Sequence, residues 1–221
     1  MKFGREGNIT PLDNKLFDLS DSYRVVNSGV VLPMSVYVQQ YHRPETFIEY
    51  CCSCPRYGLT WSCPPFRFAT ENYLRPYDAL WILATRLYPD PELNEWILSG
   101  RTQAKELYDG LIRCQRQKLD RRLLGLETTF GGARAAFAGH CHWCPPSRCT
   151  RSQGKPCRYL HKMRPSLEAL GFDLCATTTQ LLGIEMQWSE KGLLPEYYCL
   201  ISALFLPPSA HPHSSDLLDR M

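Results

Sequence analysis

The placement of the cysteines constrains this chain more than any other feature. Eight of its eleven cysteines fall into two short segments, residues 51–63 and 141–157. Thiols that only fill a hydrophobic core would be scattered along the sequence. The clustered residues are Cys51, Cys52, Cys54 and Cys63 in the first segment, and Cys141, Cys144, Cys149 and Cys157 in the second. Two cysteine-rich metal-binding loops are therefore expected.

The rest of the sequence favours reduced thiols over disulfides. The first seven residues are charged and contain glycine, unlike the apolar stretch of a secretory signal. The longest apolar run, residues 197–206, is about half of the roughly 20 residues that a membrane helix needs. We therefore expect a cytoplasmic protein with no membrane partner, in a compartment where thiols stay reduced. An odd cysteine count also fits a complete disulfide framework poorly.

Composition places the chain among ordinary globular proteins. Its 221 residues are 44% hydrophobic and 21% charged, which is enough for a hydrophobic core without help from a metal. The net charge of only +3 implies no polyanionic partner. A basic segment is expected to be a solvated helix surface, and nucleic acid is disfavoured. Its residues are Arg113, Arg116, Lys118, Arg121 and Arg122.

The pattern along the chain predicts one α/β or α+β domain with a mixed β-sheet and one long helix. The domain is expected to span residues 30–206, after an N-terminal arm at 1–29 and before a C-terminal tail at 207–221. Asp90-Pro91 predicts a helix start, and the apolar spacing continues to residue 123 with a break at Ser99-Gly100. Strands are predicted at residues 30–38, 46–50, 79–87, 133–139 and 196–206, and short helices at 165–171 and 173–183.

The second cysteine segment, Cys141-x2-Cys144-x4-Cys149-x7-Cys157, contains a complete set of four thiolate ligands. A cubane iron–sulfur cluster needs four thiolates on four irons, and loop amides stabilise it by hydrogen bonds to the sulfurs. Pro145 and Pro146 are expected to stiffen this loop. Tetrahedral zinc is the alternative, although zinc sites more often consist of two C-x2-C pairs. The sequence therefore favours one or two 4Fe-4S clusters over zinc.

The first cysteine segment offers three ligands, Cys51, Cys54 and Cys63. Adjacent residues rarely aim both side chains at one metal, so Cys52 is interpreted as a spare or substitute thiol. A cluster held by three cysteines has one iron free to bind a substrate, water or a sulfur atom. Alternatively, the cluster only transfers electrons and has a fourth ligand, drawn from Cys52, His140, His142 or another cysteine. A third possibility is one site shared by both loops.

The remaining candidates have simpler interpretations. His140 and His142 flank a loop that already has four thiols, so they are expected near the metal without binding it, or at the surface. Cys114, Cys175 and Cys199 are interpreted as small core residues. Glu168 and Asp173 are interpreted as a helix-surface group and a helix cap, respectively.

The sequence resembles a family of cysteine-rich, predicted metal-binding proteins, domain of unknown function 2284. The resemblance is carried by Cys51-x2-Cys54-Pro55-x-Tyr57-Gly58-x2-Trp61-Ser62-Cys63-Pro64-Pro65, by the second cysteine segment through Gly154-x-Pro156-Cys157-Arg158, and by residues 164–173. These blocks span residues 51–173, most of the chain. The resemblance implies a metal-binding, iron–sulfur protein and implies no established reaction.

Two functions therefore follow from the sequence. The first is an iron–sulfur protein with a four-cysteine cluster and a second three-cysteine cluster, acting in electron transfer or in a redox or sulfur-handling reaction. Its partner would be a redox protein or a small-molecule substrate, and the sequence leaves open whether it is an enzyme. The alternative is a structural zinc module that mediates protein or nucleic-acid interactions.

Overall fold

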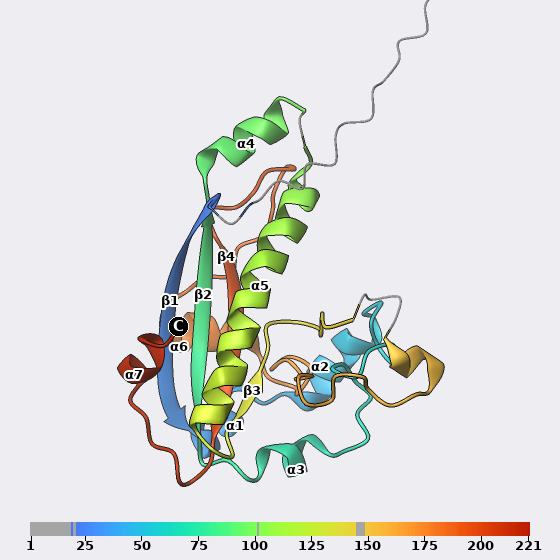
Figure 1. The fold of residues 1–221 in the computed structure, drawn as a ribbon, viewed down its shortest axis with the longest axis vertical. Helices are drawn as coiled ribbons and strands as arrows, with labels where there is room; N and C mark the ends of the chain where they lie inside the picture. Colours follow the sequence, from blue (N-terminus) through green and yellow to red (C-terminus); the bar gives the residue numbers. More distant parts are fainter. Residues whose placement is uncertain (1–18, 20, 101, 145–148) are drawn as a thin grey trace, which may run out of the picture.

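An antiparallel sheet organises the chain, for which the computed structural model describes residues 19, 21–100, 102–144 and 149–221. In this described part the sheet has four strands in the order β1-β2-β4-β3 (Figure 1). The strands are β1 (Tyr23–Pro33), β2 (Ala79–Pro89), β3 (Arg134–Ala136) and β4 (Tyr198–Leu206). The α+β class is confirmed, but every strand pairing among the described residues is antiparallel, so the sheet they form is not the expected mixed one. Most of the predicted arm, residues 1–29, lies outside the described residues.

The register explains why the sheet is antiparallel. Pro33, at the end of β1, is paired with Ala79, at the start of β2. The long excursion between them, residues 34–78, therefore leaves and rejoins the sheet at the same end of the strands, so the next strand must run back. Interleaved helices and strands in the sequence suggested a mixed sheet, but the helices of residues 34–78 return the chain to the end of the sheet that it left.

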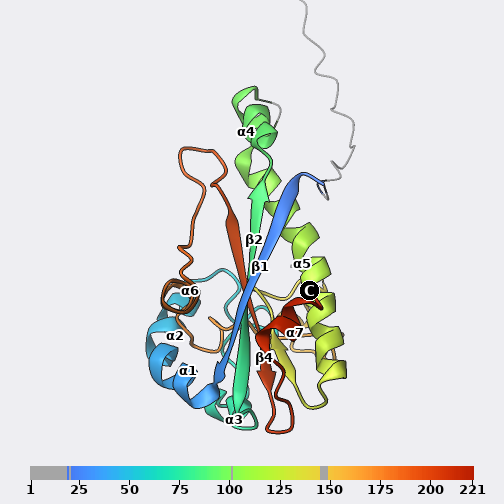
Figure 2. The ribbon, with the colours of Figure 1, turned by 90° about the vertical axis from the view of Figure 1, so that its left-hand side faces the viewer.

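Both faces of the sheet are covered, as Figure 2 shows. Leu80, Ile82 and Ala84 of β2 belong to the apolar core on the side of α1 (Met34–Tyr41) and α6 (Leu174–Leu182). The alternate residues Trp81, Leu83 and Leu87 belong to the core on the side of α5 (Ala104–Thr129) and α7 (Ser214–Leu218). Strand alternation therefore places apolar residues on both faces, which confirms the predicted buried strand at 79–87.

The long helix is also confirmed. Pro91 stands at the first turn of α4 (Pro91–Leu98), and Ser99 and Gly100 separate this helix from α5. The apolar stripe of α5 is buried against the sheet and consists of Leu107, Leu111, Leu119, Leu123 and Leu126. At α6 the predicted cap is present, because the Asp173 side chain accepts a hydrogen bond from the Ala176 backbone N–H at 2.9 Å.

The strand predicted at residues 30–38 is confirmed only for residues 30–33, which end β1, and the strand predicted at 46–50 is wrong. Residues 34–38 belong to helix α1, whose buried residues Met34, Tyr37 and Tyr41 recur at helical steps of three and four. Residues 46–50 belong to helix α2 (Pro44–Cys52), which begins with Pro44 in its first turn followed by Glu45. The first cysteine loop therefore leaves the end of a helix, not the end of a strand.

Further along the chain, the predicted elements are shorter than expected or differ in type. The segment 165–171, predicted as a helix, contains turns at residues 167–171 and no helix, and the strand predicted at 133–139 is reduced to β3. A short helix, α3 (Thr70–Leu74), precedes β2. Residues 207–221 contain α7, and Trp81 Nε1 donates to Ser214 Oγ at 3.2 Å to join this helix to the sheet. In the described residues, no helix has the length and apolar character required to cross a membrane.

A buried ion pair fixes the end of α5 to the chain that leaves the second cysteine loop. Arg164 is only 2% exposed, and its Nε donates to Glu127 Oε1 at 2.6 Å. The same carboxylate oxygen accepts a 2.6 Å hydrogen bond from the Ala135 backbone N–H in β3. Glu127 therefore holds β3 and residue 164 together.

Replacement of Glu127 should be strongly destabilising. Glu127→Ala leaves the Arg164 charge buried without its partner, which should lower the free energy of unfolding by about 3 to 5 kcal/mol. Lys105→Ala removes the exposed Lys105–Asp109 pair and should cost less than about 1 kcal/mol. Denaturant unfolding of both variants measures the difference. Equal, small losses in the two variants would show that the buried pair does not hold the fold.

Candidate metal centre

The four cysteines of the second loop lie within electrostatic range of one another. Burial, with smaller contributions from the neighbouring thiols of Cys157, Cys144 and Cys149, raises the pKa of the Cys141 thiol to about 11. Burial also raises the pKa of Cys157, and Cys149 and Cys144 act in the same direction. The structure thus places the four predicted ligands in one neighbourhood, and their binding of a metal stays a prediction. Pro145 and Pro146, predicted to stiffen this loop, lie outside the described residues.

Two backbone amides are directed at the sulfurs of this group. The Trp143 N–H donates to Cys141 and the Tyr159 N–H donates to Cys157, and each lowers the pKa of the thiol it contacts. Such hydrogen bonds stabilise the thiolate form that binds metal. The donor set and its amides therefore fit a thiolate-bound metal or cluster.

The first loop gathers its cysteines through a series of tight turns. The Cys54 N–H donates to the Cys51 carbonyl at 3.0 Å, and the Cys63 N–H donates to the Thr60 carbonyl at 3.2 Å. The loop is closed by Gly58, whose N–H donates to the Pro64 carbonyl at 2.8 Å and whose φ is +68°. Burial raises the pKa of Cys51 to about 11, with further contributions from Cys63 and Cys54.

Cys52 is placed differently from its neighbours. It is exposed on the last turn of α2, and its thiol hydrogen-bonds to Tyr57. It still lies within electrostatic range of Cys51. The structure therefore gives Cys52 a partner other than the group formed by Cys51, Cys54 and Cys63.

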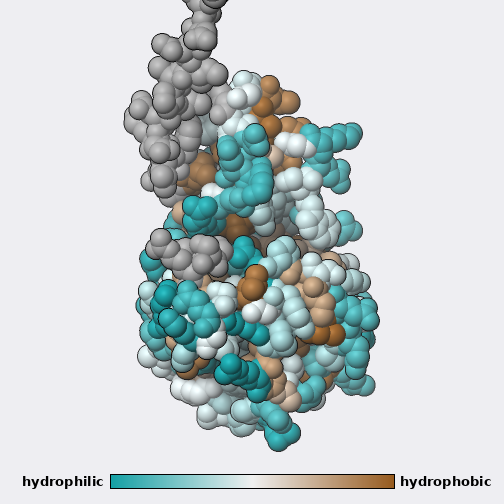
Figure 3. All heavy atoms as spheres, turned by 90° about the vertical axis from the view of Figure 1, so that its right-hand side faces the viewer, coloured by the Kyte–Doolittle hydropathy of each residue, from teal (hydrophilic) through white to brown (hydrophobic). Residues whose placement is uncertain are grey.

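The two cysteine loops are joined directly. Ser62 Oγ, in the first loop, accepts a 2.9 Å hydrogen bond from the Cys141 backbone N–H in the second. In the opposite direction, Arg151 donates from the second loop to the carbonyl oxygens of Thr60 (2.7 Å), Cys63 and Pro65. Trp61 Nε1 also donates to the Lys155 carbonyl at 3.2 Å. The cysteine loops thus form one lobe beside the sheet, on the side that faces the viewer in Figure 3, where the visible surface is mostly hydrophilic.

Helix α5 anchors the start of the second loop. Arg116 Nη2 donates to the His140 carbonyl at 2.7 Å, and Asp120, which is fully buried, lies 2.6 Å from His142 Nε2. The expectation that Arg116 lies on a solvated helix surface is wrong, since it is 6% exposed. The sequence could not reveal this role of Arg116. Its partner, the His140 carbonyl, lies 24 positions away, and the basic segment contains no pattern that marks such a contact.

The two histidines beside Cys141 have different surroundings. Burial lowers the pKa of His140 to about 4, and the charges of Arg56 and Arg116 act in the same direction, so its ring is neutral at pH 7. The His142 ring is held by Asp120 and is stacked on Trp143 with a centroid distance of 5.1 Å. Neutral His140 retains the form that can bind a metal, whereas His142 has one ring nitrogen already engaged.

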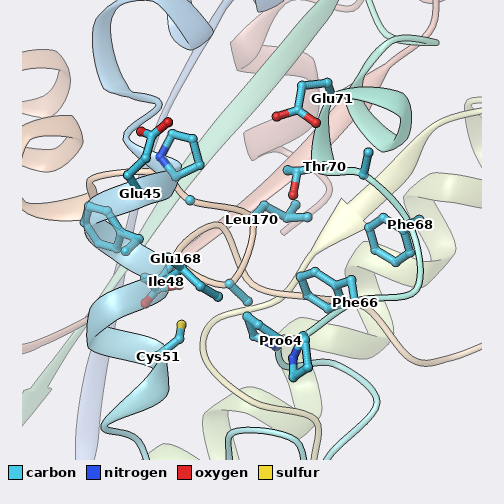
Figure 4. A pocket seen from close by; sticks show the side chains of 16 residues that line it. Glu45, Ile48, Cys51, Pro64, Phe66, Phe68, Thr70, Glu71, Glu168 and Leu170 are labelled. Carbon is cyan, nitrogen blue, oxygen red and sulfur yellow. The ribbon is translucent and has the colours of Figure 1, made fainter.

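An open cavity lies against the first cysteine loop (Figure 4). Its volume is about 430 Å³, and Cys51 and Glu168 are among its lining residues. Burial raises the pKa of the Glu168 carboxyl, and Glu168 Oε2 is buried without a hydrogen-bond partner. The interpretation of Glu168 as a helix-surface group is wrong, because this segment forms a turn that directs the carboxyl inward.

The potential metal-binding side chains of the described residues do not surround a single metal position. Among these residues, no group of three His, Cys, Asp or Glu side chains is placed to hold one metal ion. A cubane cluster instead distributes its thiolates over separate irons. Each cysteine group is therefore a neighbourhood of thiols rather than a closed ion site.

The remaining cysteines lie outside the two loops. All eleven cysteines are free thiols. Cys114 and Cys199 are half-buried, and burial raises the pKa of Cys199 to about 12, with Arg86 opposing this effect. Cys175 is exposed on α6, so its interpretation as a core residue is wrong. The apolar segment around Cys175 faces the sheet with other residues of the helix.

Comparison with protein families gives one finding. The family model DUF2284, described as a predicted metal-binding protein, matches residues 36–204. Comparisons with curated proteins and with solved structures give no significant match. The matched region includes both cysteine loops and most of the sheet.

Metal affinity should rise steeply with pH. Because the pKa values of Cys51 and Cys141 are raised to about 11, both thiols are protonated at neutral pH and must release protons to bind metal. Affinity for Cd²⁺ should increase about tenfold or more per unit from about pH 6 to about pH 8. Cadmium–thiolate absorption with a competing chelator measures this slope. Cys141→Ser should lower the slope by about one proton, and a pH-independent affinity would contradict this account.

Loss of Arg151 should loosen the first loop selectively. Arg151→Ala removes the donor to three carbonyls of residues 60–65, so hydrogen exchange in that segment should accelerate by about tenfold or more. Exchange in β2 should be unchanged, since the sheet is held by its own apolar cores. Arg121→Ala on the exposed face of α5 is the matched control. Unchanged exchange at residues 60–65 would rule out the bridging role.

Proposed function

Since the chain belongs to the DUF2284 family of predicted metal-binding proteins, we propose that its two cysteine groups hold iron–sulfur clusters used in a redox reaction. The observation that carries this proposal is the gathering of the cysteines into two thiol groups on adjoining loops. Without a bound metal, placing these thiols close together would not be favourable, because burial and the neighbouring thiols both oppose the thiolate form. A bound cation would compensate for this penalty.

Cys141, Cys144, Cys149 and Cys157 would hold the first cluster, of the 4Fe-4S type. The N–H donors of Trp143 and Tyr159 support this assignment, because hydrogen bonds to sulfur tune and stabilise such clusters. The cluster would supply one-electron transfer. Arg116 and Asp120 of α5 hold this loop, which would limit its movement when the charge of the cluster changes.

Cys51, Cys54 and Cys63 would hold the second cluster. The hydrogen bond of Cys52 to Tyr57 supports a set of three ligands. Three thiolates leave one iron open, and an open iron supplies a Lewis-acid site for a substrate or a sulfur atom. The cavity beside Cys51 supports a small-molecule substrate, because its volume lies within the range typical of ligand pockets. Electron transfer to a partner protein would then serve the reaction in this cavity.

A reducing cytoplasm suits this proposal, because the thiols must remain available until they are loaded. Tetrahedral zinc at the second loop is the competing assignment, and it would make the cysteine lobe a structural element. Metal content separates the two assignments directly.

Iron, acid-labile sulfide and zinc per chain should be measured on protein purified without oxygen. Two cubanes require about eight irons and eight sulfides, with visible charge-transfer absorption. Cys63→Ser and Cys157→Ser should each remove about half of the iron, and their remaining spectra should differ. Cys114→Ser, outside both loops, is the matched control.

Two results would overturn the proposal. One or two zinc ions without sulfide would establish the structural zinc module. Loss of the same whole signal in both loop variants would establish a single shared site.

A further inference from the structure

The two cysteine loops carry charge of one sign. Residues 53–70 and 128–167, which contain these loops, have no Asp or Glu, so all 22 acidic residues of the chain lie elsewhere. The exposed or half-buried cations of the described part of the lobe are Arg56, Arg67, Arg151, Lys155, Arg158 and Lys162. A chain with a net charge of only +3 therefore concentrates positive charge on the lobe that contains its thiol groups.

Three of these cations gather around Trp61. The guanidinium carbon of Arg67 lies 5.1 Å from the centroid of the Trp61 ring, and that of Arg151 lies 5.4 Å from it. Trp61 Nε1 donates to the Lys155 carbonyl at 3.2 Å, which places Lys155 beside the same ring. Contact with an aromatic face restricts a long arginine side chain, so less conformational entropy is lost when it meets an anion. We call Trp61 and these three cations the Trp61 patch.

The positive charge of the Trp61 patch is not neutralised by the described part of the protein. The ion pairs found among the described residues join other groups, and none of them includes Arg67, Arg151 or Lys155. Arg67 and Lys155 are also exposed to solvent. The patch can therefore attract an anionic surface without first breaking an internal ion pair.

The surroundings of the Trp61 patch favour an acidic protein over a nucleic acid. Phe66 and Phe68, the neighbours of Arg67, line the cavity beside Cys51. Glu45 and Glu71 line the same cavity, so the basic surface is bordered by carboxylates. A nucleic acid carries phosphates along its whole length and would meet these like charges, whereas a protein can match a short basic surface with a short acidic one.

The lobe also exposes apolar and aromatic side chains. Leu59 in the first loop, and Tyr159 and Leu160 after the second, are exposed. In Figure 3, hydrophobic side chains stand among hydrophilic ones on this face of the molecule. Tryptophan, tyrosine and arginine are enriched at the centres of protein–protein interfaces, so this composition is typical of a surface that binds a protein.

We propose that the Trp61 patch is the docking site of an acidic electron-carrier protein. That the partner carries electrons rests on the proposed function, because the patch lies on the cysteine loops: Trp61 stands between Cys54 and Cys63, and Lys155 stands two positions before Cys157. One electron would pass from the docked carrier, which is oxidised, to the proposed cluster, which is reduced. Docking itself requires only the exposed cations, so it can be tested whatever metal the protein holds.

The test uses three probes, which are an acidic flavodoxin, a basic cytochrome c and a single-stranded oligonucleotide. Each is titrated into the full chain as purified, and binding is measured by calorimetry. The flavodoxin should bind at about 0.05 M salt and lose about tenfold or more in affinity at about 0.5 M salt, because salt screens exposed charges. The cytochrome should not bind.

Three results with these probes would overturn the proposal. The first is no binding of flavodoxin at low salt, and the second is binding of the cytochrome as tight as that of flavodoxin. The third is tighter binding of the oligonucleotide than of flavodoxin, which would assign the basic surface to a nucleic acid instead.

Charge reversals then locate the contact. Lys155→Glu and Arg67→Glu should each weaken flavodoxin binding by about tenfold or more, because a like charge then faces the partner. Arg220→Glu makes the same change of charge after α7, which lies across the molecule from the lobe in Figure 1, and should change the affinity by less than about twofold. Equal losses in all three variants would refute the assigned site, because only the net charge would then matter. Thermal unfolding of each variant shows that it is folded.

Iron and sulfide analysis of the same samples reports separately on the proposed function. Salt-dependent binding of flavodoxin by a chain that holds no iron would retain the docking site and overturn the clusters. A chain loaded with iron and sulfide that does not bind flavodoxin would retain the clusters and overturn the docking site.

Discussion

The cysteine lobe depends on arginine side chains that supply hydrogen bonds to irregular backbone. A loop that is neither helix nor strand has carbonyl groups without regular partners, and burying them uncompensated would be costly. Arg116 donates to the His140 carbonyl, Arg151 to three carbonyls of the first loop, and Arg164 to the carbonyls of His161 and Met163. Both loops are thus held against α5 and against each other by charged donors, in a region where few apolar contacts are available.

These contacts determine how the proposed chemistry is arranged. The sheet is closed on both faces by apolar cores, so it serves as a rigid support. The thiol groups lie outside those cores, on loops that share hydrogen bonds through Ser62 and Arg151. The cavity lies beside Cys51, between α2 and the chain that follows Cys63. A small molecule in this cavity would reach the three-cysteine group without crossing the sheet.

Sequence reasoning recovered the features that depend on local pattern. The spacing of leucines predicted α5, and Asp173 predicted a helix cap. It failed where two patterns competed, as in residues 34–50, where β-branched and aromatic residues suggested strands although Met34, Tyr37 and Tyr41 already had helical spacing. It could not find Arg151, Ser62 or the inward turn of Glu168, because these roles depend on contacts between residues far apart in the chain.

The hydrogen bonds between the loops join residues 79 to 94 positions apart. Contacts of such long sequence separation carry an entropy cost of loop closure, and this cost is smaller once the sheet beside both loops has formed. The lobe should therefore be the last part of the molecule to become rigid during maturation. A polypeptide with this order of assembly can receive the proposed cofactor after its scaffold is complete.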